Sequence, residues 1–326
     1  MHVVRKEQST TTKLRIVFDA SAKSATGVSL NDLLLVGPTI HSPLIDVLIR
    51  FRFCRITITA DISKMYRAIE LAPADKELHW FVWRADSSKP LAEYRMTRVT
   101  FGVSASSFAA NMCIKQNAQD LALEYPQAAK AVEDCFYVDD CLTGADTLQD
   151  AIELRRQLQE LFIQGDFILH KWHSSKLNVL KDLPDDIKDP HSMLISLDTD
   201  TYTKTLCIEW NATSDHFRLT VTDLPHLHNL TKRALVSDIA KMFDVLGWFS
   251  PSIVKAKILL QCCWEQKLNW DDPLPSAIQD AWYNWHYELH LLAEKHIPRR
   301  YFDKSSQIAS LKLRGFCDAS ELAYAA

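Results

Sequence analysis

The sequence of 326 residues lacks several patterns that would assign it to a common protein class. Its eight cysteines contain no C-x-x-C pair and no evenly spaced framework, so we expect reduced thiols and a cytosolic or nuclear setting. No apolar run approaches the roughly 20 residues that a membrane-spanning helix needs. There is no internal repeat, no low-complexity tract and no convincing nucleophilic triad. Membrane proteins and hydrolases with a Ser or Cys nucleophile are therefore not favoured.

An excess of positive charge is also missing. Lysine and arginine number 37 against 41 acidic residues, and the net charge of −4 argues against a uniformly basic nucleic-acid-binding protein. Positive charge is present only in local groups, each of which is equally compatible with a solvated helix face: Arg50, Arg52 and Arg55; Lys232 and Arg233; Lys255 and Lys257. The composition, 47% hydrophobic and 24% charged, is typical of a globular protein with two or three domains.

One acidic pair lies in a strongly β-forming context. Asp139 and Asp140 follow the β-prone run Cys135 to Val138, and a further apolar stretch begins at Cys141. The pattern predicts a strand–turn–strand with two adjacent carboxylates at its tip. Both carboxylates cannot be buried at neutral pH unless a cation neutralises them, and Mg²⁺ prefers carboxylate oxygens. The alternative is a solvated turn in which the pair binds nothing.

A third carboxylate, Asp61, ends an upstream segment. Residues 55–61 alternate between apolar and polar side chains, which predicts a half-buried strand, and residues 62–69 then predict a short helix. An Asp at such a junction is a good helix N-cap, so a cap and a metal ligand are both compatible with the local sequence. The acidic hairpin 78 residues later favours the metal ligand.

Five further segments accompany the two acidic motifs, TADISKMYRAI (59–69) and FYVDD (136–140). They are KLRIVFDASAKS (13–24), RVTFGVSASSF (98–108), ILHKWHSS (168–175), LTKRALVSDIAKMFDVLGWFSP (230–251) and RGFCDAS (314–320). In this order they resemble the reverse transcriptases of the BEL/Pao long-terminal-repeat retrotransposons, over nearly the whole chain. Val245 departs from the pattern, since relatives usually carry Pro there. The resemblance implies an α+β right-hand polymerase with fingers, palm, thumb and connection regions and the start of a ribonuclease H domain.

The resemblance implies RNA-directed DNA synthesis, in which the primer 3′-hydroxyl attacks the α-phosphate of a deoxynucleoside triphosphate. In such enzymes two metal ions about 3.5–4 Å apart assist the attacking and leaving oxygens. By this resemblance Asp61 and Asp139 bridge the ions, Asp140 lies alongside, and the Ile62 carbonyl is a backbone ligand. The implied cofactor is Mg²⁺ or Mn²⁺. Rate enhancement then comes from positioning and electrostatic neutralisation, without a covalent intermediate.

Four residues are candidates for nucleotide binding. Lys13 and Arg15 lie in a β-like stretch, where basic residues are often only a solvated face; the resemblance implies triphosphate contact. Tyr66 falls where the family places an aromatic ring under the sugar, which excludes a 2′-hydroxyl by steric clash, although a core tyrosine is the alternative. Gly102 precedes a predicted helix and would allow close backbone approach to nucleotide or template. Phe101 stands where retroviral enzymes carry Gln, so a sugar hydrogen bond there is in doubt.

The pattern of elements supports this architecture. An amphipathic helix is predicted after Ser42 and Pro43, two strands at 79–83 and 91–99, and helices at 105–124 and 147–164, the last ending at Gly165. Strands at 204–209 and 217–221 precede a mainly helical region at 231–297. The predicted regions are partial fingers and the start of the palm (1–60), palm (61–182), thumb and connection (183–300) and a ribonuclease H start (301–326).

Both ends are expected to be partial, because the family's fingers begin earlier and its ribonuclease H domain extends further. Asp318 matches the first metal-binding carboxylate of that domain, and one carboxylate cannot organise two metals, so ribonuclease H activity is not expected. Two functions remain open: a metal-dependent RNA-directed DNA polymerase, or a non-catalytic nucleic-acid-binding remnant. The implied partners are an RNA or DNA template with primer and deoxynucleoside triphosphates, with no membrane. The expected location is the cytoplasm, in a virus-like particle, or the nucleus.

Overall fold

The computed structural model describes residues 2–5, 14–189, 203–205, 208–218, 230–242, 244–302, 310–312 and 314–325. It divides into two compact units. The first comprises Met1–Phe51 and Ile56–Ser192, and the second comprises Arg52–Arg55 and Met193–Ala326. No helix in the described ranges is both long enough and apolar enough to cross a bilayer.

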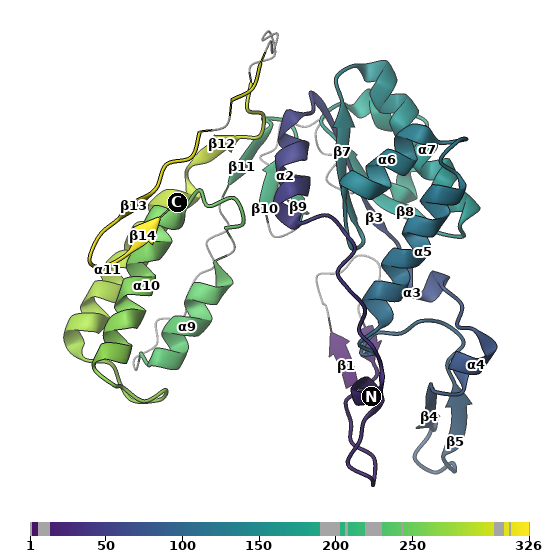
Figure 1. Cartoon of the computed structure of the whole chain (residues 1–326), viewed down its shortest axis with the longest axis horizontal. Helices are drawn as coiled ribbons and strands as arrows, with labels where there is room; N and C mark the ends of the chain where they lie inside the picture. Colours follow the sequence, from purple (N-terminus) through teal and green to yellow (C-terminus); the bar gives the residue numbers. More distant parts are fainter. Residues whose placement is uncertain are drawn as a thin grey trace. The chain divides into compact units, whose positions relative to one another are not determined.

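A four-stranded antiparallel sheet forms the centre of the first unit (Figure 1). Its strand order is β6 (Phe136–Tyr137), β7 (Asp140–Ala145), β3 (Ile56–Ile62) and β8 (Leu169–Ser174). Successive side chains of a strand point to opposite faces, so the apolar residues of β3 form one face and Thr57, Thr59 and Asp61 the other. The alternation read from residues 55–61 is thus confirmed as a strand.

Three helices pack on the apolar face of this sheet (Figure 1). They are α5 (Ser106–Asp120), α6 (Pro126–Asp134) and α7 (Leu148–Gln164). Thr147 caps α7 by accepting from the Asp150 N–H, and α6 begins with Pro126, which lacks the N–H that a first turn leaves unpaired. Their buried alanines and leucines form one core cluster with Ile58, Ala60 and Ile62. The helix predicted at 147–164 is confirmed, whereas the helix predicted at 105–124 is formed only over Ser106–Asp120.

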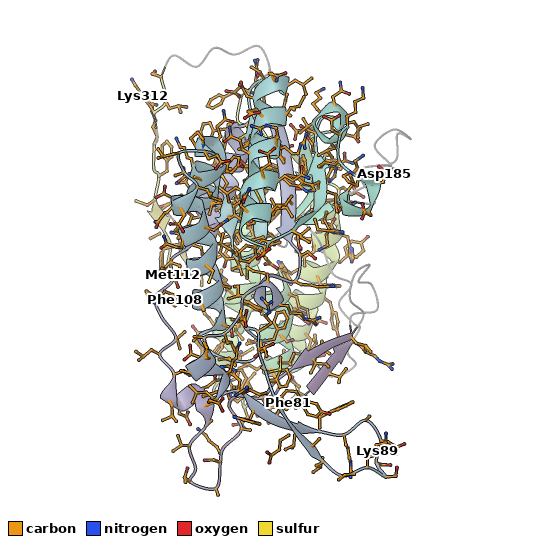
Figure 2. All side chains as sticks on the ribbon, turned by 90° about the vertical axis from the view of Figure 1, so that its right-hand side faces the viewer. Phe81, Lys89, Phe108, Met112, Asp185 and Lys312 are labelled. Atoms are coloured by element: carbon orange, nitrogen blue, oxygen red, sulfur yellow. The ribbon has the colours of Figure 1, made fainter. Side chains whose placement is uncertain are left out.

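Shorter elements complete the first unit. A ribbon pairs β1 (His2–Arg5) with β2 (Leu14–Val17), and a second ribbon pairs β4 (Trp80–Trp83) with β5 (Ala92–Arg95). Figure 2 shows Phe81 at the base of the second ribbon and Lys89 at its tip. The helices are α1 (Leu30–Leu33), α2 (Leu44–Phe53), α3 (Met65–Ala68) and α4 (Pro73–Lys76), with 3-10 turns at Leu177–Leu180 and Asp185–Ile187.

Two local predictions need correction. The short helix α3 begins at Met65 and its N-cap is Lys64, because β3 continues through Ile62; Asp61 is therefore a strand residue and not a helix cap. The strand predicted at 91–99 is formed only over Ala92–Arg95. The hairpin predicted from 79–83 and 91–99 is otherwise confirmed, with Trp80 opposite Arg95.

The described part of the second unit combines a small sheet with three helices. The sheet order is β12 (His296–Pro298), β11 (His216–Arg218), β10 (Ile208–Asn211) and β9 (Thr203–Thr205), all antiparallel. The helices α9 (Lys232–Lys241), α10 (Ser250–Glu265) and α11 (Ser276–Ala293) share a core that includes Trp282 and Trp285. A last ribbon pairs β13 (Asp318–Ala319) with β14 (Tyr324–Ala325). The mainly helical character predicted for 231–297 is confirmed.

A fully buried arginine organises the sheet of the second unit. Arg299 donates from Nε to Asp215 Oδ1 at 2.6 Å and from Nη2 to Asp215 Oδ2 at 2.9 Å. Arg52 donates from Nε to the Arg299 carbonyl at 2.7 Å and from Nη2 to the Pro298 carbonyl at 3.0 Å, which ties the short segment Arg52–Arg55 to this unit. Bidentate pairing satisfies the charge of Arg299 inside the protein.

Candidate active site

Strand pairing brings the three predicted carboxylates together at one end of the first unit's sheet. Asp61 on β3 is the direct cross-strand partner of Asp140 on β7. The Ile62 N–H donates to the Asp139 carbonyl at 2.9 Å, so the backbone beside Asp61 touches the backbone of Asp139. Side chains of directly opposed residues in an antiparallel pair lie on the same face with Cβ atoms about 4.5–5.5 Å apart. Asp61 and Asp140 therefore face the same space.

The acidic hairpin has a strained tip. Tyr137 pairs with Asp140, which leaves Val138 and Asp139 as a two-residue loop. Val138 has φ 58°, a left-handed conformation that β-branched residues rarely adopt and that two-residue hairpin loops often give to glycine. Such a conformation costs on the order of 1–3 kcal/mol and persists where the surroundings enforce it. Packing of Val138 against the core cluster supplies that constraint.

A bulge in β8 brings a cation to Asp61. Thr59 pairs with His173 and Asp61 with His170, so one intervening residue on β3 faces both Lys171 and Trp172 on β8. Trp172 is fully buried, whereas Lys171, with φ 53°, points to the other side of the bulge. Its Nζ donates to Asp61 Oδ2 at 2.8 Å. Bulges of this kind redirect a side chain and are common beside active sites.

The acidic neighbours of Asp140 act against its ionised form. The pKa of Asp140 is raised to about 7, first by burial and then by the charges of Asp139 and Asp61, while the charge of Lys171 opposes the shift. Two neighbouring carboxylates disfavour the ionised form of the third, and a nearby positive charge opposes this effect. A cation close to Asp140 would therefore favour its ionised form.

A cavity of about 220 Å³ opens beside these carboxylates. Its walls include Asp61 and Asp139, the cations Lys64, Arg67 and Lys171, and the aromatic rings of Tyr66 and Phe101. Three of the six described non-glycine residues with positive φ, namely Lys64, Val138 and Lys171, line it. Unusual backbone conformations thus gather at one place, as they do at sites where strain serves a function. Acidic, basic and aromatic surfaces meet in a single cavity.

Tyr66 lies on the wall of this cavity. Its ring is half-buried, contacts the core cluster, and meets the ring of Phe101 edge-on at a centroid distance of 4.8 Å. Burial raises the pKa of the Tyr66 hydroxyl, a hydrogen bond with Ser107 lowers it, and the charge of Asp139 raises it again. The ring therefore has both a packed edge, as a core tyrosine would, and a face toward the space next to Asp139.

Gly102 makes a close approach within the chain itself. Its φ is +99°, and a Cβ atom at this position would lie 1.8 Å from the carbonyl oxygen of Phe18. The Phe18 N–H donates to the Phe101 carbonyl at 3.2 Å, and the Asn31 side chain donates to the Gly102 carbonyl at 3.0 Å. Only glycine fits this junction. The close backbone approach that the structure shows is to Phe18, while Phe101 faces the cavity.

Three further residues, Lys13, Arg15 and Asp318, were also predicted as site residues. Lys13 falls outside the described residues, and Arg15 belongs to β2. Asp318 is exposed on β13 in the second unit, and its Oδ1 accepts from the Ala319 N–H at 2.8 Å. The structure thus brings together Asp61, Asp139, Asp140, Ile62 and Tyr66.

Sequence reasoning missed four cavity residues, Lys64, Arg67, His170 and Lys171. Within the described part of the chain, the Nδ1 atom of His170 is buried and makes no hydrogen bond. His170 and Lys171 belong to the segment ILHKWHSS (168–175), one of those that resemble the family, and this resemblance could have indicated their importance. Nothing in the local pattern indicated the bulge that turns Lys171 toward Asp61.

The donor set fits a hard divalent cation in its chemistry. Asp61, Asp139 and Asp140 offer carboxylate oxygens, which Mg²⁺ and Mn²⁺ prefer, and the raised pKa of Asp140 is the property that a bound cation would reverse. As the side chains stand, no three His, Cys, Asp or Glu residues in the described ranges are grouped closely enough to hold an ion. Asp61 is turned toward Lys171. A metal would thus have to draw the carboxylates together.

Comparison with known proteins gives two findings. Residues 231–326 match the family model described as the Pao retrotransposon-like RNaseH-like domain. A solved structure, that of the foamy viral protease-reverse transcriptase dRH in complex with ds DNA, matches 89% of this chain with a TM-score of 0.57 and 13% identity. The chain shares the fold of a retroviral reverse transcriptase. It spans 43% of that foamy viral chain, and no curated protein matches it.

The structural similarity to the foamy viral enzyme confirms the α+β class expected from the sequence. The RNaseH-like match begins at residue 231, well before the start at 301 that the sequence predicted for the ribonuclease H region. The division between the two units falls after Ser192, ten residues from the predicted end of the palm at 182. The boundaries of fingers, palm, thumb and connection stay predictions.

Proposed function

We propose that this chain is the polymerase part of a retrotransposon Pol protein and catalyses RNA-directed DNA synthesis with Mg²⁺ or Mn²⁺. One observation carries the proposal: Asp61 and Asp140 are cross-strand partners beside Asp139, and the pKa of Asp140 is raised to about 7 by burial and by the other two carboxylates. A half-buried group of neighbouring carboxylates beside a cavity is a typical feature of a metal-dependent site.

Different residues of the site would bind the metal ions, the triphosphate and the sugar. Asp61, Asp139 and Asp140, with the Ile62 carbonyl, would hold two ions, which supply activation of the primer 3′-hydroxyl and neutralisation of the pyrophosphate. Lys64 and Arg67 line the cavity and suit the charge of a triphosphate, a role proposed also for Lys13 and Arg15. Tyr66 would lie under the sugar and exclude a 2′-hydroxyl.

A non-catalytic nucleic-acid-binding remnant is the second candidate. It is favoured by the side-chain arrangement of the described residues, in which no three potential ligands are grouped for a metal and Asp61 is held by Lys171. The partners would be the same, a template–primer duplex of RNA or DNA, bound through phosphate contacts. The two candidates differ in whether bound template–primer is extended.

Primer extension separates the candidates. The purified chain, with poly(rA)/oligo(dT), dTTP and Mg²⁺ or Mn²⁺, should extend the primer. Asp139→Asn should reduce extension to background, because it removes a full charge from the metal site, while template–primer affinity stays within about twofold because phosphate contacts carry it. Asp146→Asn is the matched control, since Asp146 is exposed just beyond the opposite end of β7.

Binding without extension by the unmodified chain would decide for the remnant. Equal extension by the unmodified chain and Asp139→Asn would show that the activity arises elsewhere. In both polymerase and remnant, affinity should fall steeply as the salt concentration rises.

A further inference from the structure

Lys171 holds a position that a bound metal ion would need. Its ammonium nitrogen lies 2.8 Å from Asp61 Oδ2, and the pair is half-sheltered, with side-chain exposures of 39% for Lys171 and 26% for Asp61. A carboxylate oxygen that accepts a hydrogen bond from an ammonium group has lost part of its capacity to coordinate a cation. Since Asp61 is a proposed bridging ligand, the ion pair and the bridge compete for the same oxygen.

The backbone conformation of β8 places Lys171 next to Asp61. Lys171 reaches Asp61 only because the bulge in β8 gives it a left-handed backbone between the paired residues His170 and His173. The neighbouring Trp172 is fully buried, which anchors the bulge from the other face. The ammonium group is therefore delivered by packed structure and not by a free loop.

On the basis of the proposed function, we infer that Lys171 is a built-in counter-ion that occupies Asp61 until a divalent metal displaces it, and so sets the metal concentration at which the site fills. Lys171 is a positioning residue in this role. Without a bound metal, its ammonium group neutralises Asp61, one of the three neighbouring carboxylates. As the side chains stand, no three potential ligands in the described ranges are grouped for a metal, and Asp61 is paired with Lys171.

Lys64 provides a matched comparison within the same cavity. Like Lys171 it has a left-handed backbone, with φ 51° against 53°, and it lines the cavity, but among the described residues it forms no ion pair. Replacing either lysine by methionine removes one positive charge from the cavity on an equally unusual backbone. The difference between the two variants isolates the contact with Asp61.

The experiment measures Mn²⁺ binding directly, from the electron paramagnetic resonance signal of free Mn²⁺ in a titration without nucleotide or template. Lys171→Met should tighten Mn²⁺ binding about three- to tenfold, since the free energy of a half-sheltered ion pair is no longer lost on binding. Lys64→Met should change it less than about twofold, because it removes a solvent-screened cavity charge and no contact with Asp61. Lys171→Arg, which can still pair with Asp61, should bind as the unmodified chain does.

Equal affinities in Lys171→Met and Lys64→Met, or weaker binding in Lys171→Met, would overturn the inference and leave the proposed function intact. Mn²⁺ binding that is the same in Asp139→Asn as in the unmodified chain would overturn both, because the ions would then bind elsewhere. Thermal melting of each variant checks folding, and Lys171→Gln repeats the test with a polar side chain if the methionine variant melts early.

Discussion

Asp215 in the second unit and Asp140 in the first are both half-buried carboxylates, but their surroundings differ. Asp215 accepts two hydrogen bonds from the buried guanidinium of Arg299 and a third, at 3.1 Å, from Trp210 Nε1. Asp140 lies beside Asp139 and Asp61, which raise its pKa, and the cation that lowers it, Lys171, is paired with Asp61. One carboxylate has a permanent partner of opposite charge, and the other has two competitors of the same charge.

This difference distinguishes Asp215, which stabilises the fold through its ion pair, from Asp140, for which we propose metal binding. A buried ion pair that is fully hydrogen-bonded holds its neighbourhood together and has no need of a ligand. A buried group of like charges is unfavourable as it stands, and burial, a strained hairpin tip and a β-bulge maintain it at the cavity. Perturbed pKa values of this origin are typical of functional sites. The comparison therefore supports a stabilising role for the Asp215 pair and is consistent with the ligand-binding role proposed for the Asp61–Asp139–Asp140 group.

The largest expected effect comes from removing the charge of Asp215 in its ion pair with Arg299. Asp215→Asn should destabilise the second unit by about 3–5 kcal/mol, because it leaves the fully buried Arg299 without a counter-charge. Asn tolerates the left-handed backbone at this position, φ 56°, so backbone strain should add little. Urea denaturation followed by tryptophan fluorescence, with the core residues Trp282 and Trp285 as reporters, measures the change.

Asp271→Asn is the control for this prediction. Asp271 accepts from Arg233 Nε at 2.8 Å and Nη2 at 2.9 Å, nearly the same bidentate geometry, but both side chains are largely exposed. The expected loss is at most about 1 kcal/mol. Similar losses in the two variants would show that burial of Arg299 does not determine the effect.

The next-largest effect is expected at Tyr66, and it tests whether the cavity beside Asp61 and Asp139 binds the sugar of a nucleotide. Tyr66→Ala should raise incorporation of ribonucleotides relative to deoxynucleotides at least about tenfold, since the ring supplies the clash, whereas Tyr66→Phe should leave the ratio unchanged. Single-nucleotide incorporation measures both ratios. An unchanged ratio in the alanine variant would return Tyr66 to a packing role at the edge of the core cluster, where it also makes contacts.

The elements that could be predicted from sequence are those that local periodicity encodes. The alternation in 55–61 predicted β3, the helical patterns predicted α5 and α7, and the strand-tip positions of Asp61 and Asp139 placed both at one end of the sheet. The end of β3 was harder, because extension of the strand through Ile62 depends on hydrogen bonding to the hairpin, as in the contact from Ile62 to Asp139.

Contacts that depend on irregular backbone or on distant residues could not be predicted. Lys171 faces Asp61 because of a bulge, and a bulge leaves the pattern of apolar residues nearly unchanged. Arg299 and Asp215 lie 84 residues apart, and a lone arginine or aspartate carries no sign of its partner. Gly102 was singled out correctly as a close-approach position, but only the structure shows Phe18 as the neighbour.

A smaller effect concerns the pH dependence of stability in the metal-free chain. The folded-state pKa of Asp140, about 7, lies above the ordinary value of 3.8. Its contribution is therefore fully present below about pH 4 and is lost as the pH rises through about 7, because the unfolded chain releases the proton first. The expected loss is about 1–2 kcal/mol between pH 5 and pH 8.5, or several degrees in Tm.

Thermal melting at the two pH values in chelator-treated buffer measures this loss, and Mg²⁺ should restore stability at pH 8.5. Asp140→Asn has no titrating carboxyl at this position, so its melting temperature should fall less over the same range. A pH dependence equal to that of the unmodified chain would mean that other groups cause the loss.

The smallest effect is expected at Asp318, the exposed carboxylate on β13. Asp318 is exposed, accepts only a local hydrogen bond from Ala319 among the described contacts, and has neither the burial of Asp140 nor the cationic partner of Asp215. Asp318→Asn should change stability by less than about 0.5 kcal/mol, as is usual for an exposed position, and should leave the number of Mn²⁺ ions bound per chain unchanged. Equilibrium titration of Mn²⁺ against this variant and Asp139→Asn provides the measurement. Loss of a bound ion in Asp318→Asn would show that an exposed single carboxylate also serves as a metal ligand in this chain, and charge crowding would then no longer distinguish the functional carboxylates from the rest.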